Sequence, residues 1–137
     1  MATRTAFLSK LFGLYCVIFG VAMLLHKQAM VSTVEDLIHE PPLVLVLGIT
    51  ILAAGIAVVL THNRWSGGTA AVLVTVFGWL TLIKGAVMVF LTPDGMVSYF
   101  QAFNYAQNFY LFTAFTLIAG LYLTIAGFRT ADSQKLT

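Results

Sequence analysis

Hydropathy divides the chain into four apolar segments, and each is long enough to cross a lipid bilayer as a helix. An apolar α-helix needs about 20 residues to span the hydrocarbon core. The segments that reach this length cover residues 7–25, 43–61, 69–91 and 109–128. Only 9% of the residues are charged, against about 25% in an ordinary soluble domain. We therefore expect an all-α membrane protein that forms one integral domain over residues 1–137.

The basic residues are distributed unevenly between the connections, and this distribution predicts the orientation. Lysine and arginine favour the cytoplasmic side of a membrane protein. With the N-terminus inside, Lys27 lies outside, Lys84 lies within the third segment, and the other five basic residues are cytoplasmic. We expect a multi-pass protein of a bacterial inner membrane with both termini in the cytoplasm. The five cytoplasmic basic residues are Arg4, Lys10, Arg64, Arg129 and Lys135.

The two halves of the sequence resemble each other at an offset of 65 residues. "FGLYCVIFGVAML" at residues 12–24 aligns with "FGWLTLIKGAVMV" at residues 77–89, with five identities, and Arg64 aligns with Arg129. The first and third segments cross the membrane in the same direction, so the halves are parallel repeats related by an axis along the membrane normal. We expect two helical-hairpin repeats, at about residues 7–66 and 72–131.

Each apolar segment also carries two glycines seven residues apart. Seven residues are about two helical turns, so both glycines of a pair share one helix face. Helices in lipid associate through small residues that let their backbones approach closely, and this interval indicates a left-handed crossing. We expect a compact four-helix bundle with glycine at the helix contacts. The eight glycines are Gly13, Gly20, Gly48, Gly55, Gly78, Gly85, Gly120 and Gly127.

Lys84 lies deep within the third apolar segment. It precedes Leu91 by seven residues, which places it about 10 Å inside the outer boundary. A lysine at that depth costs about 2.5–3.5 kcal/mol. Thr81, one turn below, is placed to solvate the ammonium. The predicted spans contain no acidic residue, so the open explanations are an outer acid, a lipid headgroup, a bound anion, an acid of a partner protein, outward snorkelling or a neutral lysine.

The outer connections and a few other polar residues carry weaker signals. "AMVSTVEDLIHE" and "MVSYFQAFNYAQNFY" suit short helices at the membrane interface, and an aromatic belt with a loop is the alternative. His39 and Asp36 have helical spacing for metal ligands, but a metal site needs several converging ligands. We expect a solvated polar loop there, with no metal and no cofactor. Arg64, Trp65 and Arg129 are predicted anchors at the cytoplasmic interface.

Two stretches carry a resemblance to known proteins. "THNRW" at residues 61–65, followed by "FGWLTLIKG" at residues 77–85, resembles the small, uncharacterised multi-span proteins common in bacterial inner membranes. Each hairpin also resembles stand-alone two-span bacterial membrane proteins, with an apolar span, a turn, an amphipathic segment and a Gly-rich span. The resemblance implies a four-span inner-membrane protein, and it implies no activity, cofactor or functional residue.

The function classes are limited by what the sequence lacks. The net charge of +2 without a basic run argues against a nucleic-acid partner. The sequence contains no catalytic motif such as GxSxG, a Walker loop or HExxH, so we expect a non-enzymatic protein.

Two functional classes remain, and Lys84 distinguishes them. The first is an accessory or scaffolding subunit that associates with itself or with a larger membrane assembly, with Lys84 and residues 105–110 facing outward. The alternative is a small oligomeric channel or transporter for an ion or small solute, with Lys84 lining a cavity beside Thr81, Thr116 or Tyr122. The sparse polar content of the spans favours the first class. A third class, a lipid-binding protein, places a lipid headgroup at Lys84.

Overall fold

The computed structural model describes residues 2–133, with side chains described for residues 4–129. This part of the chain is all-helical and contains no strand. The helices are α1 (Ala2–Leu25), α2 (Lys27–Ile38), α3 (Pro41–Thr61), α4 (Thr69–Phe90), α5 (Pro93–Ala102) and α6 (Phe109–Ser133). The predicted basic residue Lys135 lies outside the described residues.

Four of these helices are long and apolar enough to cross a membrane, namely α1, α3, α4 and α6. This confirms the four predicted spans as helices and identifies a multi-pass membrane protein by length and composition. The outward faces have the composition that lipid requires, because large apolar side chains are left exposed along them. Leu60 and Phe90, for example, are 80% and 85% exposed. Such surfaces are unfavourable in water and suit the hydrocarbon core of a bilayer.

Proline, glycine and a hydroxyl cap define the helix boundaries. α3 begins at Pro41, where the missing N–H costs nothing because the first helical N–H groups have no intrahelical partner. Gly67 and Gly68 have φ values of +107° and +108°, so the chain reverses between α3 and α4 with residues that tolerate this conformation. Thr92 caps α5, since its hydroxyl oxygen accepts a hydrogen bond from the Gly95 N–H at 3.3 Å.

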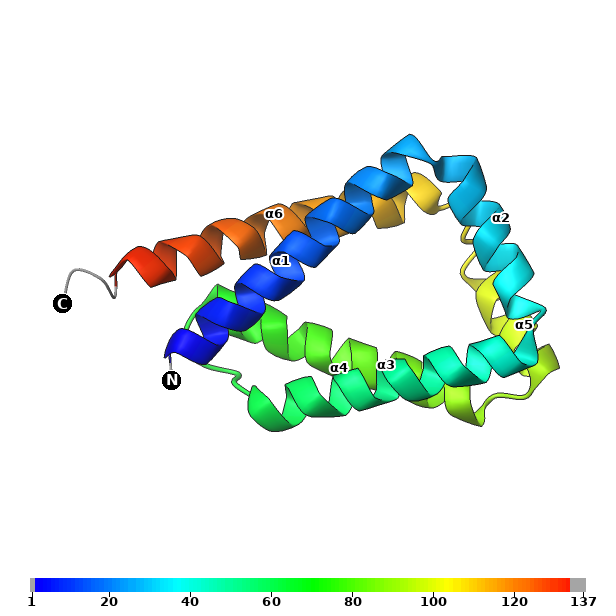
Figure 1. The fold of residues 1–137 in the computed structure, drawn as a ribbon, viewed down its shortest axis with the longest axis horizontal. Helices are drawn as coiled ribbons and strands as arrows, with labels where there is room; N and C mark the ends of the chain where they lie inside the picture. Colours follow the sequence, from blue (N-terminus) through cyan, green and yellow to red (C-terminus); the bar gives the residue numbers. More distant parts are fainter. Residues whose placement is uncertain (1, 134–137) are drawn as a thin grey trace.

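The two connections that we expected on the outer side each contain a short helix, α2 and α5. In the second of the two predicted segments, residues 96–110, the helix ends at Ala102, and residues 103–108 form turns and a bend. Figure 1 shows α2 and α5 at one end of the molecule. The start of α1, the end of α6 and the connection between α3 and α4 lie at the opposite end. The long helices therefore run between two ends of different character, one covered by short helices and one formed by helix termini and a tight turn.

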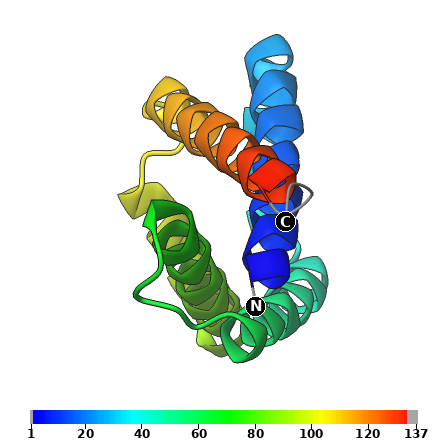
Figure 2. The same cartoon turned by 90° about the vertical axis from the view of Figure 1, so that its left-hand side faces the viewer.

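Close helix packing is concentrated within two pairs. α1 packs along α6, and α3 packs along α4, whereas contacts between the pairs are few. Figure 2 shows α6 and the upper part of α1 above α3 and α4, with the start of α1 reaching down beside α3. The main link between them joins α1 to α4, where the rings of Phe12 and Phe77 stack with centroids 6.3 Å apart. A compact bundle of all four long helices stays a prediction.

Glycine lies at the contacts within both pairs. A Cβ built on Gly85 would lie 2.5 Å from the Cα of Leu52, and one on Gly55 would lie 2.5 Å from the Cα of Leu82. These separations are shorter than any real Cβ contact, so the helices approach this closely only because no side chain is present. Each of the other predicted glycines also faces the partner helix of its pair, namely Gly13, Gly20, Gly48, Gly78, Gly120 and Gly127.

Candidate functional site

A pocket of about 400 Å³ lies between α1, α4 and α6 and is lined by Lys84. Phe19 and Met23 of α1 contribute to one wall, and Phe112 and Thr116 of α6 contribute to another. The remaining lining residues come from α2, α5 and the connection after α5: Val34, Tyr99, Phe100, Phe103 and Tyr105. The pocket is therefore mostly aromatic, with one ammonium group and three hydroxyl groups.

Lys84 has no partner in the described part of the chain. Its side chain is exposed in the pocket, and among the side chains of residues 4–129 it makes no hydrogen bond, ion pair or ring contact. Thr81, predicted to solvate it, does not line the pocket and donates its hydroxyl proton to the Phe77 carbonyl at 2.7 Å. Thr116 lines the pocket and donates to the Phe112 carbonyl at 2.8 Å, so its oxygen can still accept a hydrogen bond.

Tyr105 closes part of the pocket and is held by other aromatic rings. Its ring meets Phe109 edge-on at 5.7 Å and stacks near Phe112 at 6.0 Å. Phe109 itself is fully buried. Burial raises the pKa of the Tyr105 phenol, so this group stays protonated around neutral pH and can donate a hydrogen bond.

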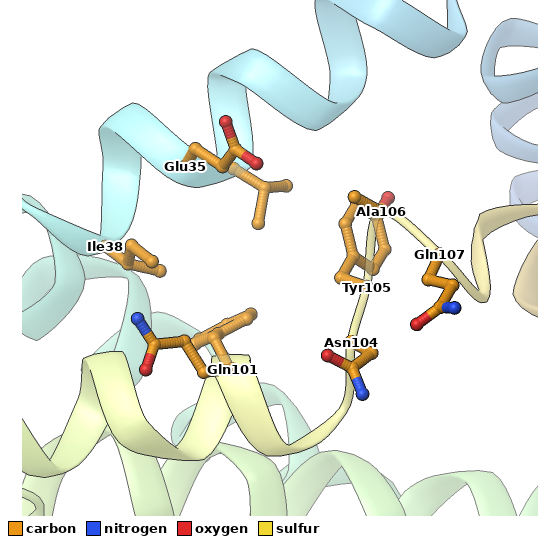
Figure 3. Close-up of a pocket in the computed structure, with 9 residues that line it drawn as sticks. Glu35, Ile38, Gln101, Asn104, Tyr105, Ala106 and Gln107 are labelled. Carbon is orange, nitrogen blue, oxygen red and sulfur yellow. The ribbon is translucent and has the colours of Figure 1, made fainter.

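A second pocket of about 240 Å³ adjoins the first on the side of α2 and α5. Figure 3 shows Glu35 of α2 facing Gln101 of α5 across this outer pocket, with Asn104 and Gln107 at the far side. The two pockets share three lining residues, Val34, Phe100 and Tyr105. These three side chains therefore form a partition between the outer pocket, whose lining is mostly apolar with a few polar side chains, and the aromatic pocket that contains Lys84.

The "THNRW" stretch has a structural role that the sequence did not reveal. His62 is 2% exposed, and its Nε2 lies 3.3 Å from the Ala71 carbonyl oxygen, so this nitrogen donates the hydrogen bond. The Thr75 hydroxyl accepts from the Arg64 N–H at 3.0 Å, and its proton is shared between the carbonyls of Arg64 (2.9 Å) and Ala71 (3.0 Å). These bonds fasten the connection between α3 and α4 onto the first turns of α4.

The predicted interface anchors lie at the same end of the molecule. Arg64 and Trp65 follow α3 and are exposed, with Trp65 62% exposed. Arg129 is exposed near the end of α6. This arrangement is compatible with contact between these side chains and lipid headgroups.

The predicted metal ligands have no third partner in the described residues. Asp36 and His39 lie at the end of α2, where the His39 N–H donates to the Asp36 carbonyl at 3.1 Å. Asp36 and His39 line one surface pocket with Glu40, but in the described residues they do not form a group of three ligands close enough to hold a metal ion. Lys84, Thr116 and Tyr105 line a different pocket.

Comparisons with protein-family models, with curated proteins and with solved structures find no match for this chain. Sequence reasoning missed most of the aromatic wall, including Tyr99 and Phe112. The one available signal was Phe19, which takes the place of Lys84 in the first half of the sequence and lines the same pocket.

Proposed function

We propose that this chain is a non-enzymatic multi-pass protein of a bacterial inner membrane that binds and passes a small anionic solute at Lys84. It belongs in this view to the channel or transporter class. The observation that carries the proposal is the placement of Lys84 in a pocket that Thr116 and Tyr105 also line, without a partner in the described chain.

The free-energy cost of Lys84 supports a functional role. An ammonium group at this depth costs about 2.5–3.5 kcal/mol, and no described acid offsets that cost. An ionisable residue inside a membrane that faces a cavity typically marks a substrate or ion pathway. A cation that faces a pocket favours an anion as its ligand, since an anion supplies the missing counter-charge.

Contacts at equivalent positions support two related halves, although each long helix packs mainly against a helix of the other half and not against its own hairpin partner. Gly20 of α1 lies against Leu117 of α6, and Gly85 of α4 lies against Leu52 of α3. Gly85 follows Gly20 by 65 residues, and Leu117 follows Leu52 by the same interval. The pair α1/α6 is therefore matched by the pair α4/α3, which is the pattern that a twofold axis along the membrane normal would produce.

The stacked rings of Phe12 and Phe77 lie where such an axis would pass, because these residues are also 65 positions apart. Few contacts join the two pairs elsewhere. We infer that the pairs form one four-helix unit in the bilayer and can rock against each other about this contact. Rocking of one helix bundle against another around a fixed site is how many transporters alternate access to that site.

The orientation with both termini in the cytoplasm is part of the same proposal. It is supported by the excess of lysine and arginine at that end and by the common end shared by the start of α1, the end of α6 and the α3–α4 connection. The outer pocket and its partition then face the outside.

Uptake into liposomes tests this function. Liposomes that contain the purified protein should take up radiolabelled benzoate or chloride faster than empty liposomes. Lys84→Met should reduce that rate about tenfold or more, because the ligand loses its counter-charge, whereas Lys84→Arg should retain most of it. Uptake equal to that of empty liposomes for both anions, or an unchanged rate in Lys84→Met, would refute the proposal.

An accessory or scaffolding role is the second candidate, and the limited contact between the helix pairs favours it. Helix pairs that touch each other little leave surface for a helix of a partner protein or of a second copy, which would also supply an acid to Lys84. Native mass spectrometry after gentle extraction distinguishes the two. A stoichiometric larger complex favours the accessory role, and a clean homo-oligomer favours a channel or transporter.

A further inference from the structure

We propose that the Lys84 pocket takes an amphiphile: a molecule with one anionic group, a carboxylate or a phosphate, joined to an apolar body. This inference rests on the proposed anion site at Lys84 and specifies the rest of the ligand. Three observations support it: the apolar walls of the pocket, the different residues that the two halves of the sequence contribute at equivalent positions, and the adjoining outer pocket.

The walls of the pocket are too apolar for a purely hydrophilic anion. The lining groups other than Lys84 are mainly phenyl rings, with Phe19, Phe103 and Phe112 facing the same space. Ligand pockets are typically about 300–1,000 Å³, with predominantly apolar walls and a few placed polar groups. A volume of about 400 Å³ fits this description. A small hydrated anion would lose its hydration water in this pocket and gain only the contact with the Lys84 ammonium. A ligand with an apolar body would also contact the aromatic walls.

Equivalent positions in the two halves give the pocket one charged side and one apolar side. Lys84 and Phe19 are 65 residues apart, as are Tyr99 and Val34, and all four line the pocket. The pocket thus extends across the region where the halves meet. At these positions the second half presents an ammonium and a phenol, while the first half presents a phenyl ring and an isopropyl group. Phe103 and Phe112 of the second half add to the apolar wall. A ligand that is polar at one end and apolar at the other matches both sides.

The outer pocket offers the charged group hydrogen-bond donors on its way inward. The amides of Gln101, Asn104 and Gln107 line this pocket, as does the carboxylate of Glu35 on its α2 side. Tyr105 belongs to both pockets, and its protonated phenol can donate to a carboxylate or phosphate that passes it. An anionic head can therefore exchange hydrogen bonds from amide to phenol to ammonium while its apolar body reaches the phenyl rings.

Binding of three defined probes to the protein in nanodiscs tests this inference. The probes are dodecanoate, its neutral counterpart dodecanol, and butyrate, which has the same head and almost no apolar body. We expect dodecanoate to bind at least about tenfold more tightly than either of the others. Lys84→Met should remove the preference for dodecanoate over dodecanol, and Lys84→Arg should restore it. Lys27→Met, which removes a lysine at the outer end, is the control and should leave the preference intact.

The outcomes separate this inference from the function on which it rests. If butyrate binds as tightly as dodecanoate and both depend on Lys84, the amphiphile is refuted and the anion site stands. If no probe shows a dependence on Lys84, both are refuted. Preference for dodecanoate that depends on Lys84 supports both.

The same assay identifies the source of the amphiphile. Nanodiscs of phosphatidylcholine alone are compared with nanodiscs that also contain anionic phosphatidylglycerol. If dodecanoate binds more weakly in the nanodiscs with phosphatidylglycerol, and Lys84→Met abolishes this difference, a lipid of the bilayer is the occupant. Unchanged binding supports a free amphiphilic acid from outside.

Discussion

Replacement of Gly85 by leucine is expected to separate α3 from α4 and to destabilise the protein by about 3 kcal/mol or more, the upper end for overpacking of a tight interior. A Cβ at this position meets the backbone N of Leu52 and lies 2.5 Å from its Cα. Backbone atoms cannot rotate away as a side chain can, so the whole helix must shift. The loss is measured by reversible unfolding in mixed micelles of mild detergent and dodecyl sulfate.

Two substitutions serve as controls for Gly85→Leu. Ala86→Leu changes a half-buried neighbour and should cost much less. Gly20→Ala tests the equivalent position in α1, where the nearest atoms belong to the side chain of Leu117 and its backbone N is 3.7 Å away. That side chain can move, so Gly20→Ala should be tolerated better than Gly85→Ala. Equal tolerance of Gly85→Leu and Ala86→Leu would contradict the role of glycine at the helix contacts.

Replacement of Thr75 by valine is expected to destabilise the α3–α4 connection by about 1–3 kcal/mol, the cost of leaving a buried donor unsatisfied. Valine keeps the shape of threonine but cannot accept the hydrogen bond from the Arg64 N–H. Thr75 is fully buried, so water has poor access to replace the hydroxyl. Thermal unfolding in detergent gives the magnitude, and Thr75→Ser should restore most of the stability.

Thr81→Val is the matched control for Thr75→Val. Thr81 lies on the same helix, and its hydroxyl donates only to the Phe77 carbonyl of its own helix. A threonine bond of this kind contributes little to helix stability, so this variant should unfold close to the wild type. A similar loss of stability in both variants would show that the hydrogen bonds between Thr75 and the α3–α4 connection do not cause the loss in Thr75→Val.

The four spans were predictable because their signal is local. Length and hydropathy define each one within its own segment, and Pro41, Gly67 and Gly68 mark their limits. The ends were less certain. α1 begins at Ala2 and α6 ends at Ser133, both beyond the predicted spans, since an apolar run defines the part in lipid and a helix can continue into water.

The partners of each helix were not predictable from hydropathy. Glycines spaced seven apart predict that a face is close to another helix, but they do not name that helix. The pairing of α1 with α6 joins the two ends of the chain, and only the fold reveals it. The hydrogen bonds of Thr75 with Arg64 were missed for the same reason, since a threonine in an apolar helix gives no sequence signal for a distant backbone group.

The sequence predicted the charged residue of the candidate site but not the residues that surround it. Lys84 stood out because a charge within an apolar segment is costly and therefore informative. The surroundings of Lys84 did not stand out, because Phe19, Phe112 and Tyr105 are ordinary residues for membrane helices and interfaces. They become a pocket only when α1, α6 and the connection after α5 are brought together. Thr81 was chosen by proximity along α4, whereas Thr116, from another helix, lines the pocket.

The central claim is that Lys84 faces a pocket that water and solutes reach from the outer pocket, past Tyr105, and that it does not face lipid. The most direct test is the reactivity of Lys84→Cys, in a Cys16→Ala background, toward a small membrane-impermeant methanethiosulfonate added outside intact cells. Ile83→Cys is the matched control, because Ile83 is the preceding residue, is 53% exposed and does not line the pocket. Cysteines at Gln107 and Ser66 report the outer and cytoplasmic sides.

The proposal predicts that cysteine at position 84 reacts at least about tenfold faster than cysteine at position 83, as expected for a thiol that water can reach. Dodecanoate should slow that reaction. If cysteines at positions 84 and 83 are equally unreactive while cysteine at position 107 reacts, Lys84 faces lipid or a closed interior. That result would contradict a ligand site at Lys84.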